Sequence, residues 1–62
     1  MNSNLTEITK EIKKIEEKAE KDYSEIINNL SDVEIVKKIS AIRDDEKEHI
    51  KLCDKIIGII NS

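Results

Sequence analysis

Apolar residues recur at steps of three and four along both halves of the chain, and this spacing constrains the fold more than any other feature. A helix repeats every 3.6 residues, so such a series lines one helical face, whereas a strand needs alternation with period two. The first series is Leu5, Ile8, Ile12, Ile15, Ala19, Tyr23, Ile26 and Leu30. The second series is Ile35, Ile39, Ile42, Glu46, His49, Cys53, Ile56 and Ile60. The sequence therefore predicts an all-α protein built from two helices.

Polar residues at capping spacing predict where the two helices begin. Asn4 followed by Glu7 is typical of a helix start, because a short polar side chain accepts from the free N–H groups of the first turn. Ser31 and Glu34 have the spacing of a capping box, in which each side chain satisfies the other's backbone N–H. The second helix is therefore expected to start at Ser31, after the break at "NNLSD".

The predicted fold is one antiparallel hairpin that forms a single domain over residues 1–62. Its helices span about 4–29 and about 32–60, and its loop spans about 29–31. The chain has no Phe or Trp and one Tyr, and 40% of its residues are charged, so its core is small. Because a single Cys excludes an internal disulfide, stability must come from a metal, a partner chain or both. We expect two hairpins to pair into a four-helix bundle, as a homodimer or a higher homo-oligomer.

Charge and hydropathy argue against several classes of partner. The net charge is −3 with the signs well mixed, so neither a nucleic acid nor a membrane is an expected partner. The first residues are polar, and the longest apolar run, Ile56–Ile60, is too short to span a bilayer. A lone cysteine without a secretion signal predicts a cytoplasmic protein.

Three ionisable residues interrupt the apolar series. Glu16 lies on the apolar face of the first helix, and Glu46 and His49 replace apolar residues in the second series. Glu16 is fifteen residues before Ser31 and Glu46 is fifteen after it, so antiparallel helices that turn at Ser31 bring them to the same level. His49 lies one turn further along the same face. The two carboxyl groups and the imidazole are therefore expected to converge.

A metal ion is the simplest compensation for this group. Ionised carboxylates are costly in an apolar face, and no Lys or Arg lies within the series to pair with them. Carboxylate oxygens and a neutral imidazole suit iron, manganese or zinc. Cys53 lies one turn beyond His49, either as a small hydrophobic residue or as a thiolate near the metal. Glu20 and Asp45 lie at the edges of the faces and are expected to be solvated.

The spacing of these residues resembles a known family. "EEKAEKDY" places Glu16, Ala19 and Tyr23 at intervals of three and four, and "EKEH" is a Glu-x-x-His motif formed by Glu46 and His49. Together they resemble the hairpin of the ferritin-like di-iron carboxylate proteins, rubrerythrins and two-helix encapsulated ferritins above all. In that superfamily one helix supplies a Glu and the next a Glu-x-x-His, and the set occurs twice around a metal pair. A complete ferritin-like domain has four helices in one chain, whereas this chain has two.

The resemblance implies a function and a role for each residue. Glu16 would be a terminal ligand, Glu46 a bridging carboxylate and His49 a terminal nitrogen ligand. Tyr23 would stand beside the metal as a hydrogen-bond partner, and is the one candidate catalytic side chain. The implied cofactor is iron, two ions per dimer, with manganese or zinc as alternatives. The implied reaction is oxidation of Fe(II) or reduction of peroxide or dioxygen, with an electron donor that the sequence does not identify.

Non-catalytic interpretations of the same residues remain open. The chain could be a helical dimerisation module with a vestigial site or a structural zinc ion. Glu46 and His49 would then be a polar pair that fixes the register of two packed helices. Tyr23 would be a packing residue.

Overall fold

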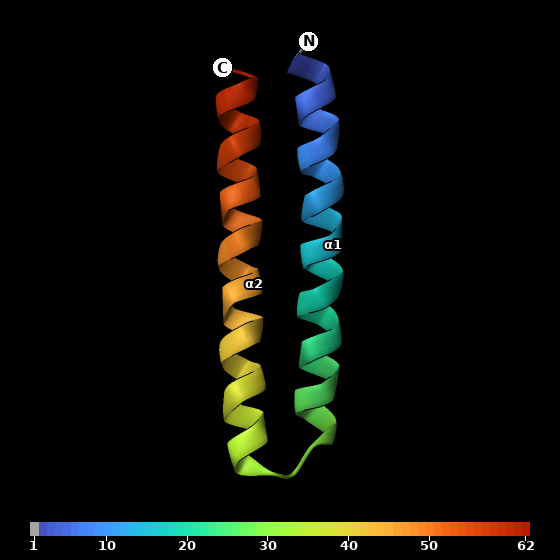
Figure 1. Cartoon of the computed structure of the whole chain (residues 1–62), viewed down its shortest axis with the longest axis vertical. Coiled ribbons are helices and arrows are strands. Elements are labelled where there is room, and N and C mark those ends of the chain that lie inside the picture. The colour runs from blue at the N-terminus through green and yellow to red at the C-terminus, as the bar shows by residue number, and fades with distance from the viewer. Residues whose placement is uncertain (1) are drawn as a thin grey trace.

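The structure, a computed structural model that describes residues 2–62, is a two-helix antiparallel hairpin. Helix α1 spans Asn2–Asn29 and helix α2 spans Val33–Ile60, each with 28 residues. The helices lie side by side over their whole length, and both chain ends lie at the end opposite the loop (Figure 1). Within residues 2–62 there is no strand. The predicted all-α hairpin is confirmed.

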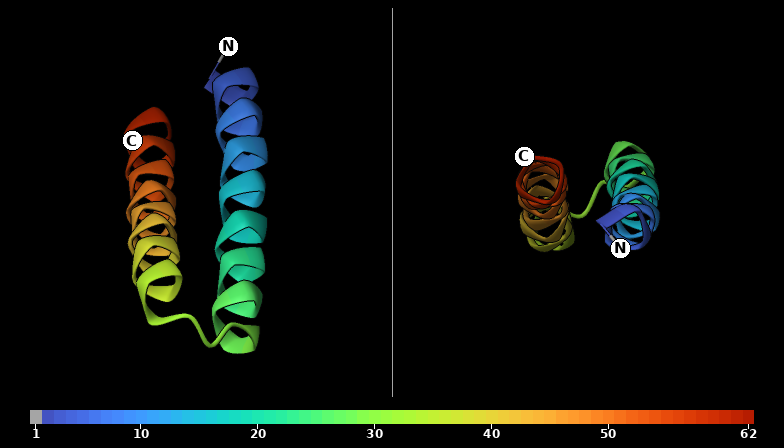
Figure 2. Two further views of the ribbon diagram at one scale, coloured as in Figure 1. Left: turned by 60° about the horizontal axis from the view of Figure 1, so that its bottom comes forward. Right: turned by 90° about the horizontal axis from the view of Figure 1, so that it is seen from above.

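The hairpin is a thin rod. Its extents are 47 × 14 × 10 Å, as expected for one layer of two helices that each rise about 1.5 Å per residue. The end-on view shows α1 and α2 beside each other, with nothing from the described chain covering either broad face (Figure 2). Neither described helix combines the length and the apolar character that crossing a membrane requires.

The start of α2 corrects the predicted capping box. Asp32, not Ser31, is the N-cap: its backbone is extended, and its Oδ1 accepts from the N–H of Ile35 at 3.0 Å. Both residue types cap helices well. The spacing of Ser31 to Glu34 matched the reciprocal motif, but the carboxylate one position later makes the bond. The loop is accordingly residues 30–32 rather than 29–31.

The start of α1 also differs from the prediction. The helix already includes Asn2, so Asn4 lies inside its first turn and is not the cap. Capping preference is weak where several short polar residues follow one another, as in "NSN" here. The difference is two residues, which is the usual uncertainty at a helix end. The end of α1 at Asn29 agrees with the prediction.

Residues at seven-residue spacing on the two helices form rows with different surroundings. The facing rows, defined as Thr9, Glu16 and Tyr23 on α1 and Ile39, Glu46, Cys53 and Ile60 on α2, are buried or half-buried. The flanking rows, defined as Leu5, Ile12 and Ile26 on α1 and Ile35, Ile42, His49 and Ile56 on α2, are exposed. The apolar members of the flanking rows are 38% to 54% exposed. The isoleucines are thus divided between two surroundings: those of the flanking rows are exposed, whereas Ile27, Ile39, Ile50, Ile57 and Ile60 are half-buried.

The reason is geometric. A heptad pattern presents two adjacent rows, and one partner helix can cover only part of such a stripe. In this hairpin the better covered row includes polar residues. Thr9 is buried and its hydroxyl donates to the carbonyl of Leu5 at 2.8 Å. Cys53, 5% exposed, is the only buried hydrophobic residue among those whose burial is described.

Candidate metal centre

Glu16, Glu46 and His49 come together at mid-height of the hairpin. Glu16 projects from the middle of α1, and Glu46 and His49 project from successive turns of α2. Each residue offers one ligand atom, and these atoms all lie within 4.8 Å of one another. The convergence predicted from the equal spacing of Glu16 and Glu46 from Ser31 is thus present in the structure. Three donors of this kind, so close together, could hold a metal ion.

His49 joins the two helices. Its Nδ1 lies 3.1 Å from Oε2 of Glu16 and 4.0 Å from Oε2 of Glu46. When Glu16 is ionised it can only accept, so Nδ1 carries the hydrogen and donates it. The lone pair of the neutral ring is then on Nε2. This tautomer leaves a lone pair on Nε2 for a metal, whereas an ion held between Nδ1 and the two carboxylates requires the other tautomer, with the hydrogen on Nε2.

The two carboxyl groups form a hydrogen-bonded pair that favours a single shared proton. Hydrogen bonds from Glu46 and then from His49 hold the pKa of Glu16 below its ordinary value. The hydrogen bond to Glu16, desolvation and the charge of Glu16 raise the pKa of Glu46. Two carboxylates at this separation resist ionising together. A proton is therefore held more readily by Glu46 than by Glu16.

Nearby side-chain cations are engaged elsewhere. Lys13, one turn before Glu16, pairs with Asp54 at 2.8 Å. Arg43, one turn before Glu46, pairs with its neighbour Asp44 at 3.3 Å. In the described part of the chain, no Lys or Arg forms an ion pair with Glu16 or Glu46. His49 is therefore the one side chain in the described part of the chain that can offer the carboxyl pair a positive charge, and it does so only when protonated.

The group lies at the border between the two kinds of row. The side chains of Glu16 and Glu46, in the facing rows, are 21% and 17% exposed. That of His49, in the flanking row, is 55% exposed. The ligands therefore open onto the exposed apolar side of the hairpin. Two oxygen donors and one imidazole nitrogen are a donor set that fits iron, manganese or zinc, and they leave further coordination positions free.

Tyr23 and Cys53 lie in the facing rows at some distance from the carboxyl pair. Tyr23 is half-buried, seven residues after Glu16, which is about 10 Å along the helix axis. Among the described residues no hydrogen bond joins Tyr23 to Glu16, Glu46 or His49, so its role beside a metal stays a prediction. Cys53 is a buried free thiol one turn beyond His49. Its burial fits the interpretation as a small hydrophobic residue.

Two contacts across the hairpin were not predicted from the sequence. Lys13 pairs with Asp54, and the Thr6 hydroxyl donates to Oδ1 of Asn61 at 3.3 Å near the open end. The available signal was a Lys one turn before Glu16 and an Asp just beyond His49, with opposite charges at nearly one level. Periodicity alone did not reveal it, because both residues lie outside the apolar series.

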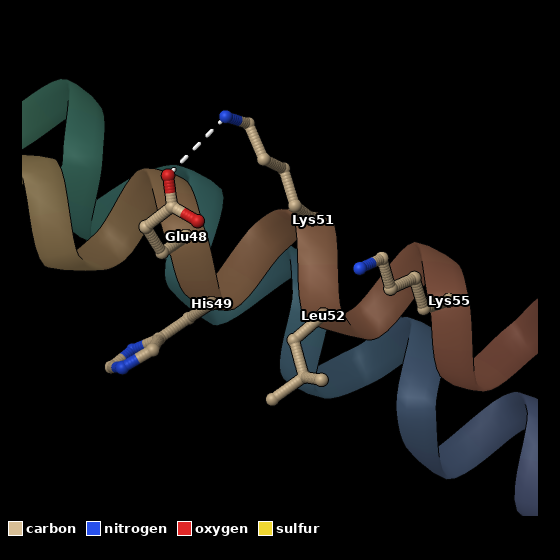
Figure 3. A pocket seen from close by; sticks show the side chains of 5 residues that line it. All are labelled: Glu48, His49, Lys51, Leu52 and Lys55. Carbon is tan, nitrogen blue, oxygen red and sulfur yellow. Dashed lines mark hydrogen bonds and ion pairs between the residues drawn. The ribbon is translucent and has the colours of Figure 1, made fainter.

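A shallow pocket adjoins the candidate centre only through His49. It is lined by Glu48, His49, Lys51, Leu52 and Lys55, all from α2. Figure 3 shows the His49 ring directed away from Lys51 and Lys55, with the Lys51 ammonium paired to Glu48 at 3.3 Å. Neither Glu16 nor Glu46 lines this pocket. It is a surface depression along one helix, distinct from the group of converging ligands.

Comparison of the chain with protein-family models, with curated proteins and with solved structures finds no match in any of the three. The structure supports the fold of the predicted resemblance, a helical hairpin, and its Glu, Glu and His group.

Proposed function

We propose that the protein binds a divalent metal, iron by preference, through Glu16, Glu46 and His49. The observation that carries the proposal is geometric: ligand atoms of two carboxyl groups and a histidine lie within 4.8 Å of one another, and among the described residues no Lys or Arg pairs with either carboxyl group. Such a pair gains most from a cation that replaces its proton. Oxygen donors with one imidazole match Fe(II) well, and they also accept Mn(II) or Zn(II).

We further propose that the working unit contains two copies of the hairpin. The flanking rows expose six large apolar side chains at seven-residue multiples on adjacent sides of α1 and α2. This is the pattern with which helices pack into a four-helix bundle. A second hairpin laid on these rows would cover the isoleucines and would also cover the exposed His49. One dimer interface would thus cover both the exposed apolar surface and the open side of the ligand group.

Two copies would supply four carboxylates and two imidazoles around two metal ions. Four negative charges balance two divalent ions, which removes the electrostatic cost of placing the carboxylates together. Glu16 and Glu46 lie near the middle of their helices, where a two-fold axis across the bundle would bring both sets close. The shared dinuclear site is therefore the arrangement that uses every donor.

The proposed reaction is oxidation of Fe(II) by peroxide or dioxygen. With peroxide the balance is simple: two Fe(II) ions each lose one electron, and one peroxide with two protons becomes two water molecules. The chain's own residues bind and orient the ions, and the covered flanking rows restrict access of water. The carboxyl pair can also take up and release a proton.

Anaerobic titration with Fe(II) tests the proposal. We expect one Fe(II) per chain in a dimer, measured by calorimetry and sedimentation, and an absorbance change of the bound iron when peroxide or oxygen is admitted. Glu48→Ala, which changes an exposed carboxylate next to His49, serves as the matched control for Glu46→Ala. Binding that is unaffected by Glu46→Ala would overturn the proposed site.

A non-catalytic dimerisation module is the second candidate. It is favoured by the exposed isoleucines of the flanking rows, which would drive association whether or not metal is bound. A dimer that binds only zinc, or that binds iron without reacting with peroxide or oxygen, supports this alternative.

A further inference from the structure

Lys13 is near enough to Glu16 along α1 to compete with a metal ion for the ligand carboxylates. It lies three residues before Glu16 on α1, so the two side chains are neighbours on the helix surface. A lysine ammonium on a flexible four-carbon stem can reach a carboxylate at this spacing. Bound there, it would neutralise the carboxyl pair and occupy the place of a metal ion.

The structure shows a different partner for Lys13. Its ammonium lies 2.8 Å from Oδ1 of Asp54 on the other helix. The hydrogen bond and the charge of Asp54 raise the pKa of Lys13, with smaller contributions from Glu17 and Cys53. The pKa of Glu16 responds to Glu46 and His49. The lysine charge is thus directed across the hairpin, toward α2 and away from the ligand group.

We propose that Asp54 is a positioning residue that keeps Lys13 from pairing with Glu16 and so keeps the carboxyl pair available to a metal. The inference rests on the proposed metal-binding function. It assigns a task to an ion pair that contributes little to stability, because the side chains of Lys13 and Asp54 are 30% and 57% exposed.

Removal of the Asp54 charge should therefore weaken metal binding through Lys13. In Asp54→Asn the lysine is free to turn to Glu16, and the dissociation constant for Mn²⁺ should rise about two- to fivefold, the range expected for an exposed ion pair. The double variant Lys13→Gln/Asp54→Asn removes the competitor and should bind Mn²⁺ like the wild type. Lys13→Gln alone should change affinity by less than about twofold.

A matched control separates this effect from a general loss of negative charge. Lys18 and Asp22 form an ion pair at 2.7 Å within α1, away from the ligand group. Asp22→Asn makes the same change of charge and should leave Mn²⁺ affinity nearly unchanged. High salt should also reduce the difference between Asp54→Asn and wild type, because the competing pair is exposed and screened.

The experiment is calorimetric titration of the full-length variants with Mn²⁺ at low and high salt, with helicity and mass measured on the same samples. Weakening in Asp54→Asn, with recovery in the double variant, supports the inference. Equal effects of Asp54→Asn and Asp22→Asn, or a double variant as weak as Asp54→Asn, would overturn it while leaving the proposed function intact. A wild type that binds no metal would overturn both.

Discussion

The facing rows and the flanking rows of the hairpin differ in a way opposite to an ordinary small core. The facing rows, between the helices, include two carboxyl groups, a threonine, a tyrosine and a thiol. The flanking rows, on the outside, are apolar except for His49 and remain exposed. The facing rows also include two isoleucines, Ile39 and Ile60, but in a self-sufficient hairpin more of the large apolar side chains would face inward. Under the proposed function, the metal chemistry lies between the helices and a second hairpin covers the apolar flanking rows.

The first and largest test of this comparison is to place charge in the flanking rows. Ile12→Asp/Ile42→Asp should prevent association, because four half-exposed isoleucine side chains per dimer would no longer be buried. Burial of the exposed half of one isoleucine side chain contributes about 0.75–1.5 kcal/mol. Loss of four such contributions is about 3–6 kcal/mol, which raises the dimer dissociation constant more than about a hundredfold. Sedimentation velocity over a concentration series measures the change.

The control uses exposed apolar residues that lie outside both rows. Leu52 and Ile59 are 55% and 74% exposed on α2, and Leu52→Asp/Ile59→Asp should leave association largely unchanged. A wild type that stays monomeric and helical at micromolar concentration would contradict the role given to the flanking rows.

The second test removes ligands from each kind of row in turn. Glu16→Ala and Glu46→Ala act in the facing rows, and His49→Ala acts in a flanking row. Each should weaken Fe(II) binding more than about a hundredfold, because loss of a partner outside the ligand set already costs 10–100-fold in typical sites. Anaerobic titration measures the affinity, and circular dichroism checks that the helices persist. Retention of tight binding in His49→Ala would confine the site to the two carboxylates.

The third test uses pH to separate the two carboxyl groups. At a pH below the raised pKa of Glu46, metal must displace a proton from this carboxyl group. Below that raised pKa, and above the lowered pKa of Glu16, affinity should fall about tenfold per pH unit through this one proton. In that pH range, calorimetry in buffers of different ionisation enthalpy should show one fewer proton released in Glu46→Gln than in wild type. Equal proton release would contradict the shared proton.

The same pKa shifts make the stability of the metal-free protein depend on pH. The raised pKa of Glu46 contributes stability that is present below its ordinary pKa and is lost as pH rises through the raised value. The lowered pKa of Glu16 contributes stability above its ordinary pKa, which is lost as pH falls through the lowered value.

The fourth and smallest expected effect concerns stability without metal. Glu46→Leu removes one of two neighbouring carboxyl groups and places an apolar side chain in a facing row, so the melting temperature in chelator should stay equal or rise. With Fe(II) present, the wild type should gain stability and the variant should not. A clear fall in the melting temperature of metal-free Glu46→Leu would show that Glu46 is structural.

Periodicity was sufficient to predict the hairpin and the level of the ligand group. The three- and four-residue steps indicated two helices. Glu16 and Glu46 are equally far from Ser31 in the sequence, which placed them opposite each other. It could not predict which row faces the other helix. When an apolar stripe is wider than one partner can cover, the pattern alone does not determine the rotation of each helix about its axis. That rotation buried Thr9 and left Ile12 and Ile42 exposed.

Side-chain contacts outside the apolar series were also beyond sequence reasoning. The N-cap fell on Asp32 because either of two adjacent polar residues could serve, and only the backbone decides between them. The pairing of Lys13 with Asp54 depends on the offset between the helices along their common axis, which periodicity does not determine. The functional role of Tyr23 stays a prediction for the same reason, since its hydroxyl could have several partners.

The most direct test of the central claim is a crystal structure of the protein grown with Mn²⁺ or Fe(II), with the ions located by anomalous scattering. We predict two ions per pair of hairpins, about 3.5–4 Å apart as in other two-metal sites. Each should be bound by carboxylates from both chains, and the flanking rows should be buried between the chains. Ions far apart, each held by the Glu16, Glu46 and His49 of a single chain, would contradict the shared site.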